Sequence, residues 1–173
     1  MNNKLNIMEF LRRYRDNRGA MAALRYLLKS GAKMRGWQII SKINGIGDCV
    51  IETIAGLYGL HPLEKTDNKY NFGDACRALS LLRKKNVSIY TEDETDDMKS
   101  PFDSRFRRLL ACDTREELCL HLVDVVRGLK SENIPINYES LCSDIKYWGE
   151  RVREKWAVHY WCNRKEDSEN VSD

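Results

Sequence analysis

Three arginines within four positions mark the most distinctive stretch of the sequence, DSRFRRLLACDTREEL at residues 103–118. No acid separates Arg105, Arg107 and Arg108, although helix surfaces usually mix their charges. Each residue of a helix turns by about 100°, so Arg105 and Arg108 share a face and Arg107 points elsewhere. A leucine and a cysteine occupy the positions four residues after Arg105 and Arg108, where a pairing acid could stand. This pattern leaves both arginines available to an external anion.

Basic pairs recur on the two helical segments that follow. Arg127 and Lys130 share a helix face at a spacing of three residues, and Arg151 and Lys155 share one at a spacing of four. Nearby acids can neutralise these groups only in part. Repeated basic pairs suit the phosphate backbone of a nucleic acid, which is bound through charge and without selection of a particular base. For any single pair, an ordinary solvated surface charge is the alternative.

The net charge of +3 conceals an uneven distribution of acids. Five acids lie at positions 92–97 and four more lie at 166–173. Without these nine, the rest of the chain holds 29 basic and 17 acidic residues, a net charge of +12. A body this basic is typical of a protein that binds a polyanion, and a solvated basic surface is again the alternative.

Residues that could support catalysis or hold a metal are scattered along the chain. His61 stands in an expected loop, His121 within an apolar helix and His159 among aromatic residues, and none has a partner at H-x-x-x-H or H-E-x-x-H spacing. Cys119 and His121 are two positions apart, so they point to different faces of a helix. The stretch GIGDC has the glycines of a phosphate loop but lacks its lysine and follows a helix. The sequence therefore predicts a protein that is not an enzyme, with no catalytic residue, no metal ligand and no cofactor.

The composition indicates a helical protein of the cytoplasm. The 173 residues include only 10 Gly and 3 Pro, which argues against a β-sandwich or a Pro-rich linker protein. No apolar run approaches 18 residues, so we expect neither a signal peptide nor a membrane span. The six cysteines are scattered without a C-x-x-C pair, as is typical of reduced thiols inside the cell.

Apolar spacing predicts helices along the chain and no sheet. In the first helical segment Ile7, Phe10 and Leu11 follow the spacing of an amphipathic helix. Asp113 resembles an N-cap, and Glu116 three residues later would close a capping box. The expected helices cover residues 6–16, 20–31, 37–43, 49–60, 72–85, 101–110, 113–129, 138–148 and 150–161.

Helices joined by short breaks imply an all-α fold of two small packed helical bundles. Helical periodicity is lost at residues 86–100, where acids dominate. We therefore expect an N-terminal helical lobe at 1–90, an acidic flexible connection at 91–100, a C-terminal helical lobe at 101–163 and an acidic disordered tail at 164–173.

Six segments in a fixed order carry a resemblance to a known family: GAMAALRYLLKSG, AGLYGLHP, NFGDACRALSLL, RFRRLLACD, INYESLCSDIKYW and VREKWAVHYW. Over roughly residues 5–162 the sequence resembles the CasB family, the small subunit of the type I-E CRISPR surveillance complex Cascade. The resemblance implies an all-helical, non-catalytic subunit that binds DNA without sequence specificity and stabilises the R-loop. It implies as partners the target and displaced DNA strands, a second copy of the chain, and the large and backbone subunits of Cascade, with crRNA contacted indirectly and no membrane.

The resemblance also selects particular basic positions. Arg25, Arg105, Arg127 and Arg151 look like basic positions of the family, and Arg25 is selected only in this way. The turn NGIGD lacks the basic residue that some relatives carry there. The candidate nucleic-acid-binding residues are therefore Arg25, Arg105, Arg108, Arg127, Lys130, Arg151 and Lys155.

Two other classes of protein also fit these residues. A helical protein–protein adaptor would use the basic face to bind an acidic protein, and its affinity for DNA would be negligible even at low salt. A helix-turn-helix regulator would prefer particular DNA sequences at a defined half-site spacing. A salt titration of binding to random single-stranded DNA separates both classes from the small-subunit interpretation.

Overall fold

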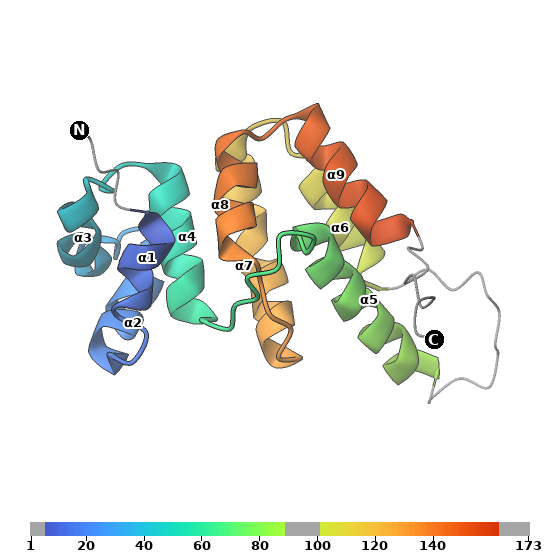
Figure 1. Ribbon diagram of the computed structural model, residues 1–173, viewed down its shortest axis with the longest axis horizontal. Helices are drawn as coiled ribbons and strands as arrows, with labels where there is room; N and C mark the ends of the chain where they lie inside the picture. The colour runs from blue at the N-terminus through green and yellow to red at the C-terminus, as the bar shows by residue number, and fades with distance from the viewer. Residues whose placement is uncertain (1–5, 89–100, 163–173) are drawn as a thin grey trace, which may run out of the picture.

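The computed structural model describes residues 6–88 and 101–162, which form an all-α fold (Figure 1). Sheet-like pairing in these residues is limited to an isolated parallel bridge between Glu64 and Ile136. None of the described helices is long and apolar enough to cross a membrane. The α-helices are α1 (Ile7–Arg12), α2 (Arg18–Arg25), α3 (Met34–Ile40), α4 (Cys49–Leu60), α5 (Phe72–Ser88), α6 (Asp103–Leu110), α7 (Arg115–Ser131), α8 (Tyr138–Lys146) and α9 (Glu150–Trp161), with 3-10 turns η1 (Tyr26–Leu28) and η2 (Ser41–Ile43).

The prediction of an all-α fold is confirmed. In Figure 1, α1 to α4 lie on one side of the molecule, α5, α6 and α9 lie on the other, and α7 and α8 stand between them. The predicted acidic connection at 91–100 and the predicted tail at 164–173 lie outside the described residues.

Helix α5 packs mainly with the second half of the chain, although the sequence predicts it in the lobe at 1–90. Its main contacts are with α9 and α7, whereas α4 contacts α2, α7 and α8. Buried apolar residues from both halves form one continuous core cluster. The division into lobes stays a prediction, and the contacts of α5 favour a boundary in the loop before this helix.

Polar side chains cap the first turn of several helices. Asn6, Asn17, Asp48, Thr114 and Asn137 precede α1, α2, α4, α7 and α8, and each side-chain oxygen accepts a hydrogen bond from a backbone N–H of the first turn. A cap of this type contributes about 1 kcal/mol to helix stability because it satisfies a donor that has no partner within the helix.

The start of α7 is one residue later than the sequence predicted. Thr114, not Asp113, is the N-cap, and its hydroxyl oxygen accepts from the backbone N–H of Glu117 at 3.2 Å. The Glu117 carboxylate in turn accepts from the backbone N–H of Asp113 at 3.0 Å. The predicted capping box of Asp113 and Glu116 is therefore wrong by one residue, since Thr114 and Glu117 form the contacts. Asp and Thr are both favoured N-cap residues, so the residue types alone could not decide between the two positions.

Two glycines of α4 allow α2 and η1 to approach closely. A Cβ at Gly59 would lie 2.8 Å from Leu24 Cβ and 2.9 Å from the Met21 carbonyl oxygen. A Cβ at Gly56 would lie 2.6 Å from Leu28 Cδ2. Both sets of distances are shorter than normal van der Waals contacts. At Gly59 the close atoms include the α2 backbone, so this packing of α2 on α4 requires glycine there, whereas at Gly56 the close atoms belong to the Leu28 side chain.

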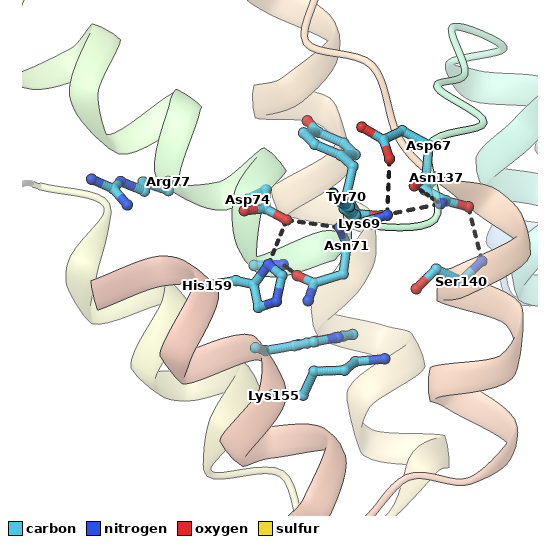
Figure 2. A network of polar contacts seen from close by, with 12 residues as sticks. Asp67, Lys69, Tyr70, Asn71, Asp74, Arg77, Asn137, Ser140, Lys155 and His159 are labelled. Carbon is cyan, nitrogen blue, oxygen red and sulfur yellow. Dashed lines mark hydrogen bonds and ion pairs between the residues drawn. The ribbon is translucent and has the colours of Figure 1, made fainter. Parts of the chain in front are cut away.

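The loop between α4 and α5 is hydrogen-bonded to the segment that leads into α8. The side-chain amide of Asn137 donates to the carbonyl oxygens of Asp67 and Tyr70 at 2.9 and 3.0 Å. Figure 2 shows Asn137 reaching this loop from the start of α8. The backbone N–H of Ile136 donates to the Leu63 carbonyl oxygen at 3.0 Å. These bonds attach the loop to the second half of the chain along most of its length.

His61 ends α4 as a buried structural residue. Its Nε2 lies 2.7 Å from the carbonyl oxygen of Ile134, so Nε2 carries the hydrogen and donates it. Burial lowers the pKa of His61, which keeps the ring neutral at pH 7. The Tyr138 hydroxyl donates to the His61 carbonyl oxygen at 2.6 Å.

Helices α5 and α9 touch at Gly73. A Cβ at Gly73 would lie 2.4 Å from the carbonyl oxygen of Trp156 and 3.1 Å from the Cβ of His159. The Asp74 carboxylate accepts from the backbone N–H of Asn71 at 2.8 Å and contacts Nδ1 of His159 at 2.7 Å (Figure 2). The start of α5 is therefore fixed to α9 by packing and by polar contacts together.

Substitution of Gly73 by alanine should destabilise the protein by about 1–3 kcal/mol, because the new methyl group overlaps the backbone of α9. The matched control is Gly19→Ala, since Gly19 is exposed in α2 and a Cβ there would meet only Asn17 Oδ1 at 3.5 Å. Urea denaturation followed by circular dichroism measures both. Equal midpoints for the two variants would contradict the packing described for Gly73.

Candidate nucleic-acid interface

A hollow of about 520 Å³ lies where α6 meets α7 and α5. Arg105 and Arg108 of α6 line it, and Arg127 lines it from α7. Phe106 and Leu109 are fully buried on the inner face of α6, which directs the intervening arginines outward. The shared face that the sequence predicted for Arg105 and Arg108 therefore opens onto a concave surface.

Two further hollows continue from this one toward α2. The second hollow is lined by Arg25 and Arg127, so it shares Arg127 with the first. The third hollow is lined by Arg25 and Lys130, so it shares Arg25 with the second. We call the three adjoining hollows the basic groove. Asp124 is the acid among its lining residues, and its basic residues are Arg15, Arg18, Arg25, Lys29, Arg83, Arg105, Arg108, Arg127 and Lys130.

Most of the predicted groove residues have little ionic pairing inside the described part of the chain. Arg127 pairs with Asp124 at 3.0 Å, but their side chains are 62% and 70% exposed, so water screens the pair and it contributes little. Arg105, Arg108 and Lys130 are exposed, and none of them forms an ion pair with another described residue. The groove thus presents positive charge that Asp124 offsets only in part.

Arg25 reaches the groove because of the close approach of α2 to α4. A Cβ at Gly59 would lie 3.1 Å from the backbone nitrogen of Arg25, so the end of α2 lies directly against α4. The Arg25 Nε donates to the Met21 carbonyl oxygen at 3.4 Å, one turn earlier in the same helix. Helix α4 also contacts α7, which brings Arg25 and Arg127 to the walls of the same hollow.

Four basic residues of the groove were not predicted from the sequence. Arg83 of α5 is half-buried, and its guanidinium group lies over the Phe102 ring at 5.8 Å from the ring centre. No local pattern distinguishes Arg83 from the lysines that follow it, because only the packing of α5 on α7 brings it to the hollow. The other three lie at or near α2 and became groove residues through its packing on α4: Arg15, Arg18 and Lys29.

Two predicted residues do not line the groove. Arg151 is exposed in the first turn of α9. Lys155 forms an ion pair with Asp144, whose side chain is only 4% exposed. The other carboxylate oxygen of Asp144 accepts from the indole N–H of Trp156 at 2.7 Å. Lys155 therefore neutralises a buried acid and joins α9 to α8, a role that helix spacing cannot reveal.

The described residues thus form an all-helical fold with three basic hollows that share lining arginines. The sequence model of the CRISPR-associated protein Cse2 matches residues 10–161, so the chain belongs to the Cse2 family. This match confirms the resemblance to CasB small subunits that the sequence analysis proposed. A comparison with curated proteins found no match.

Solved structures of the family have a similar fold. CasB from Thermus thermophilus has a TM-score of 0.65 and 19% identity, over 93% of this chain and 99% of that chain. CasB from M. ruber has a TM-score of 0.63 and 21% identity, over 91% of this chain and 93% of that chain. A second structure of a Cse2-family protein from Thermus thermophilus has a TM-score of 0.62 and 22% identity, over 93% of this chain and 99% of that chain.

Replacement of Lys155 by methionine should lower the free energy of unfolding by about 1–3 kcal/mol, because the buried Asp144 carboxylate loses its cation. Arg151→Met is the matched control on the same helix and should change stability by less than about 0.5 kcal/mol. Chemical denaturation of both variants gives the comparison. If Lys155→Met unfolds like the parent protein, the structural role assigned to Lys155 is wrong.

Proposed function

We propose that this protein is the small subunit of a crRNA-guided Cascade complex and that its basic groove holds the backbone of a single DNA strand without reading its bases. One observation carries the proposal. Five residues selected from the sequence line the same groove, although they come from three helices: Arg25, Arg105, Arg108, Arg127 and Lys130.

The composition of the groove suits a phosphate backbone. Guanidinium groups donate two parallel hydrogen bonds to phosphate, and exposed lysines add charge without strict geometry. Each phosphate that a basic residue neutralises releases a condensed counterion, so binding is favourable at low salt and needs no particular sequence. Basic residues distributed over adjoining hollows would contact successive phosphates of one strand.

A modest binding energy would be sufficient for R-loop stabilisation. The heteroduplex of guide and target is about as stable as the DNA duplex that it replaces, so opening of the DNA is nearly balanced. A few contacts to the displaced or the target strand therefore shift the equilibrium toward the open state. The proposed partners are these two strands, a second copy of the chain, and the large and backbone subunits of the complex.

The proposed role is binding and not catalysis. Two of the histidines that could act as bases have structural partners: His61 donates to the Ile134 carbonyl oxygen, and His159 contacts the Asp74 carboxylate. The charged residues of the groove are mainly arginine and lysine, which serve to bind anions. We therefore assign the groove no reaction of its own.

Charge reversal at Arg105, Arg108 and Arg127 should weaken binding of random single-stranded DNA and flatten its salt dependence. Each lost phosphate contact should reduce the log–log slope by about 0.7, which gives a reduction of about 2 for the triple variant. All three side chains are exposed, so circular dichroism and thermal melting should change little. Filter binding at a series of salt concentrations provides the measurement.

The control for this experiment is charge reversal at Arg13, Lys69 and Lys146, three exposed residues outside the groove. It changes the net charge equally and should leave the salt slope close to that of the parent protein. Equal losses in both triple variants would show that net charge, not the groove, determines binding. Negligible DNA binding by the parent protein at low salt would instead favour an adaptor that binds an acidic protein.

A further inference from the structure

Three potential metal ligands of different types meet between α6 and α7. Cys112 follows α6, and Glu117 and His121 lie in the first half of α7, at a spacing of C-x-x-x-x-E-x-x-x-H. The Cys112 Sγ, a Glu117 carboxylate oxygen and a His121 ring nitrogen all lie within 4.8 Å of one another. We propose that these three side chains bind one transition-metal ion of the Zn²⁺ class.

The position of Cys112 is fixed from two directions. Its side chain is buried, with a relative exposure of 1%. Its carbonyl oxygen accepts from the indole N–H of Trp148 at 2.9 Å and from Arg153 Nη2 at 2.7 Å. Trp148, just before α9, and Arg153, in the first turn of α9, thus fix the turn that carries the thiol. The position of this turn does not depend on a bound ion.

The other two ligands are set by α7. Glu117 and His121 are four residues apart, a spacing that places side chains next to each other on one face of a helix. Glu117 Oε2 accepts from the backbone N–H of Asp113 at 3.0 Å, which orients the carboxylate and leaves Oε1 for an ion. His121 is half-buried, and it lines the hollow next to α6.

The geometry is compatible with a tetrahedral ion. Zinc bonds of about 2.0–2.3 Å place neighbouring ligand atoms about 3–4 Å apart. The three ligand atoms lie within 4.8 Å of one another, so each would have to move by about 1 Å to reach this spacing. On binding, the Cys112 thiol would release its proton to solvent and the thiolate would take the ion.

The ligand set selects the class of metal. A thiolate and an imidazole favour Zn²⁺ and Co²⁺, whereas Mg²⁺ and Ca²⁺ prefer sites built from oxygen alone. Three protein ligands leave a fourth position for water or another small ligand. Arg153, which donates to the Cys112 carbonyl oxygen, is a cation close to the cluster, and it also lies 3.7 Å from an Asp113 carboxylate oxygen.

The site adjoins the basic groove, because His121 also lines the hollow that contains Arg105 and Arg108. A bound divalent ion would add positive charge at that wall of the groove. The inference of a metal site nevertheless rests only on the three ligand side chains and does not depend on the proposed function.

Cobalt binding tests the inference directly. Full-length protein without a histidine tag, kept reduced with a phosphine, is titrated with Co²⁺ and followed by absorption. We expect a thiolate-to-cobalt charge-transfer band and the intense d–d bands of tetrahedral cobalt, saturating at one equivalent and lost when Zn²⁺ is added. The readout contains no DNA, so its result is separate from that of the groove variants.

Ligand variants identify the site. Glu117→Gln keeps an acceptor for the Asp113 N–H, and His121→Asn keeps a polar side chain, so both variants should fold. Each of these, and Cys112→Ser, should weaken cobalt affinity at least about tenfold. The controls are Glu116→Gln, an exposed neighbour on the same helix, and Cys162→Ser, an exposed thiol; both should bind like the parent.

Three results would overturn the inference. They are the absence of a charge-transfer band in the parent protein, unchanged affinity in Glu117→Gln and His121→Asn, and loss of the band in Cys162→Ser. If Cys112→Ser does not fold, the other two ligand variants still decide the question.

Discussion

The contact of α2 with α4 at Gly56 and Gly59 is the constraint on which the groove depends. Side chains at these positions would collide with α2 and with the 3-10 turn that follows it. Because a glycine side chain is only a hydrogen atom, α2 can lie against α4. Helix α4 in turn packs on α7. Arg25 and Arg127, which are distant in the sequence, consequently line one hollow. The positively charged surface is thus shaped by van der Waals packing between two helix backbones, at positions that carry no charge.

The basic residues of the protein divide into two groups with different roles. Some pair with acids that are largely buried and connect elements, as Lys155 does with Asp144. Arg12 is another example, because it pairs with Glu64 at 3.0 Å and thereby joins α1 to the loop after α4. Groove residues such as Arg105 have no such pairing within the described chain. These two ionic contacts lie apart from the groove, so they do not use the charge of Arg105.

Much of the fold could be predicted from the sequence, because apolar spacing reports directly on helices. The partner of each helix could not be predicted, so nothing in the sequence indicated that α5 packs mainly on α9 and α7. In the site, Arg105 and Arg108 were found by helix spacing, whereas Arg25 required the family resemblance. Arg83 gave no local signal, since only tertiary packing brings it to the groove. Lys155 was selected because it lies four residues after Arg151 on one helix. That spacing could not predict the ion pair of Lys155 with the buried Asp144 of α8.

The loop between α4 and α5 has a consequence for the entropy of binding. Asn137 and Ile136 bond to this loop, and Tyr138 bonds to the end of α4, so the connection between the two sides of the groove is fixed by hydrogen bonds in the free chain. Its backbone freedom is lost when the protein folds, not when a ligand arrives. Association then restricts mainly the rotamers of long basic side chains, at about 0.5–1.5 kcal/mol for each one that is immobilised. A preformed groove of this kind loses less conformational entropy on binding than a groove whose walls must first become ordered. A larger part of the electrostatic attraction therefore remains as binding free energy.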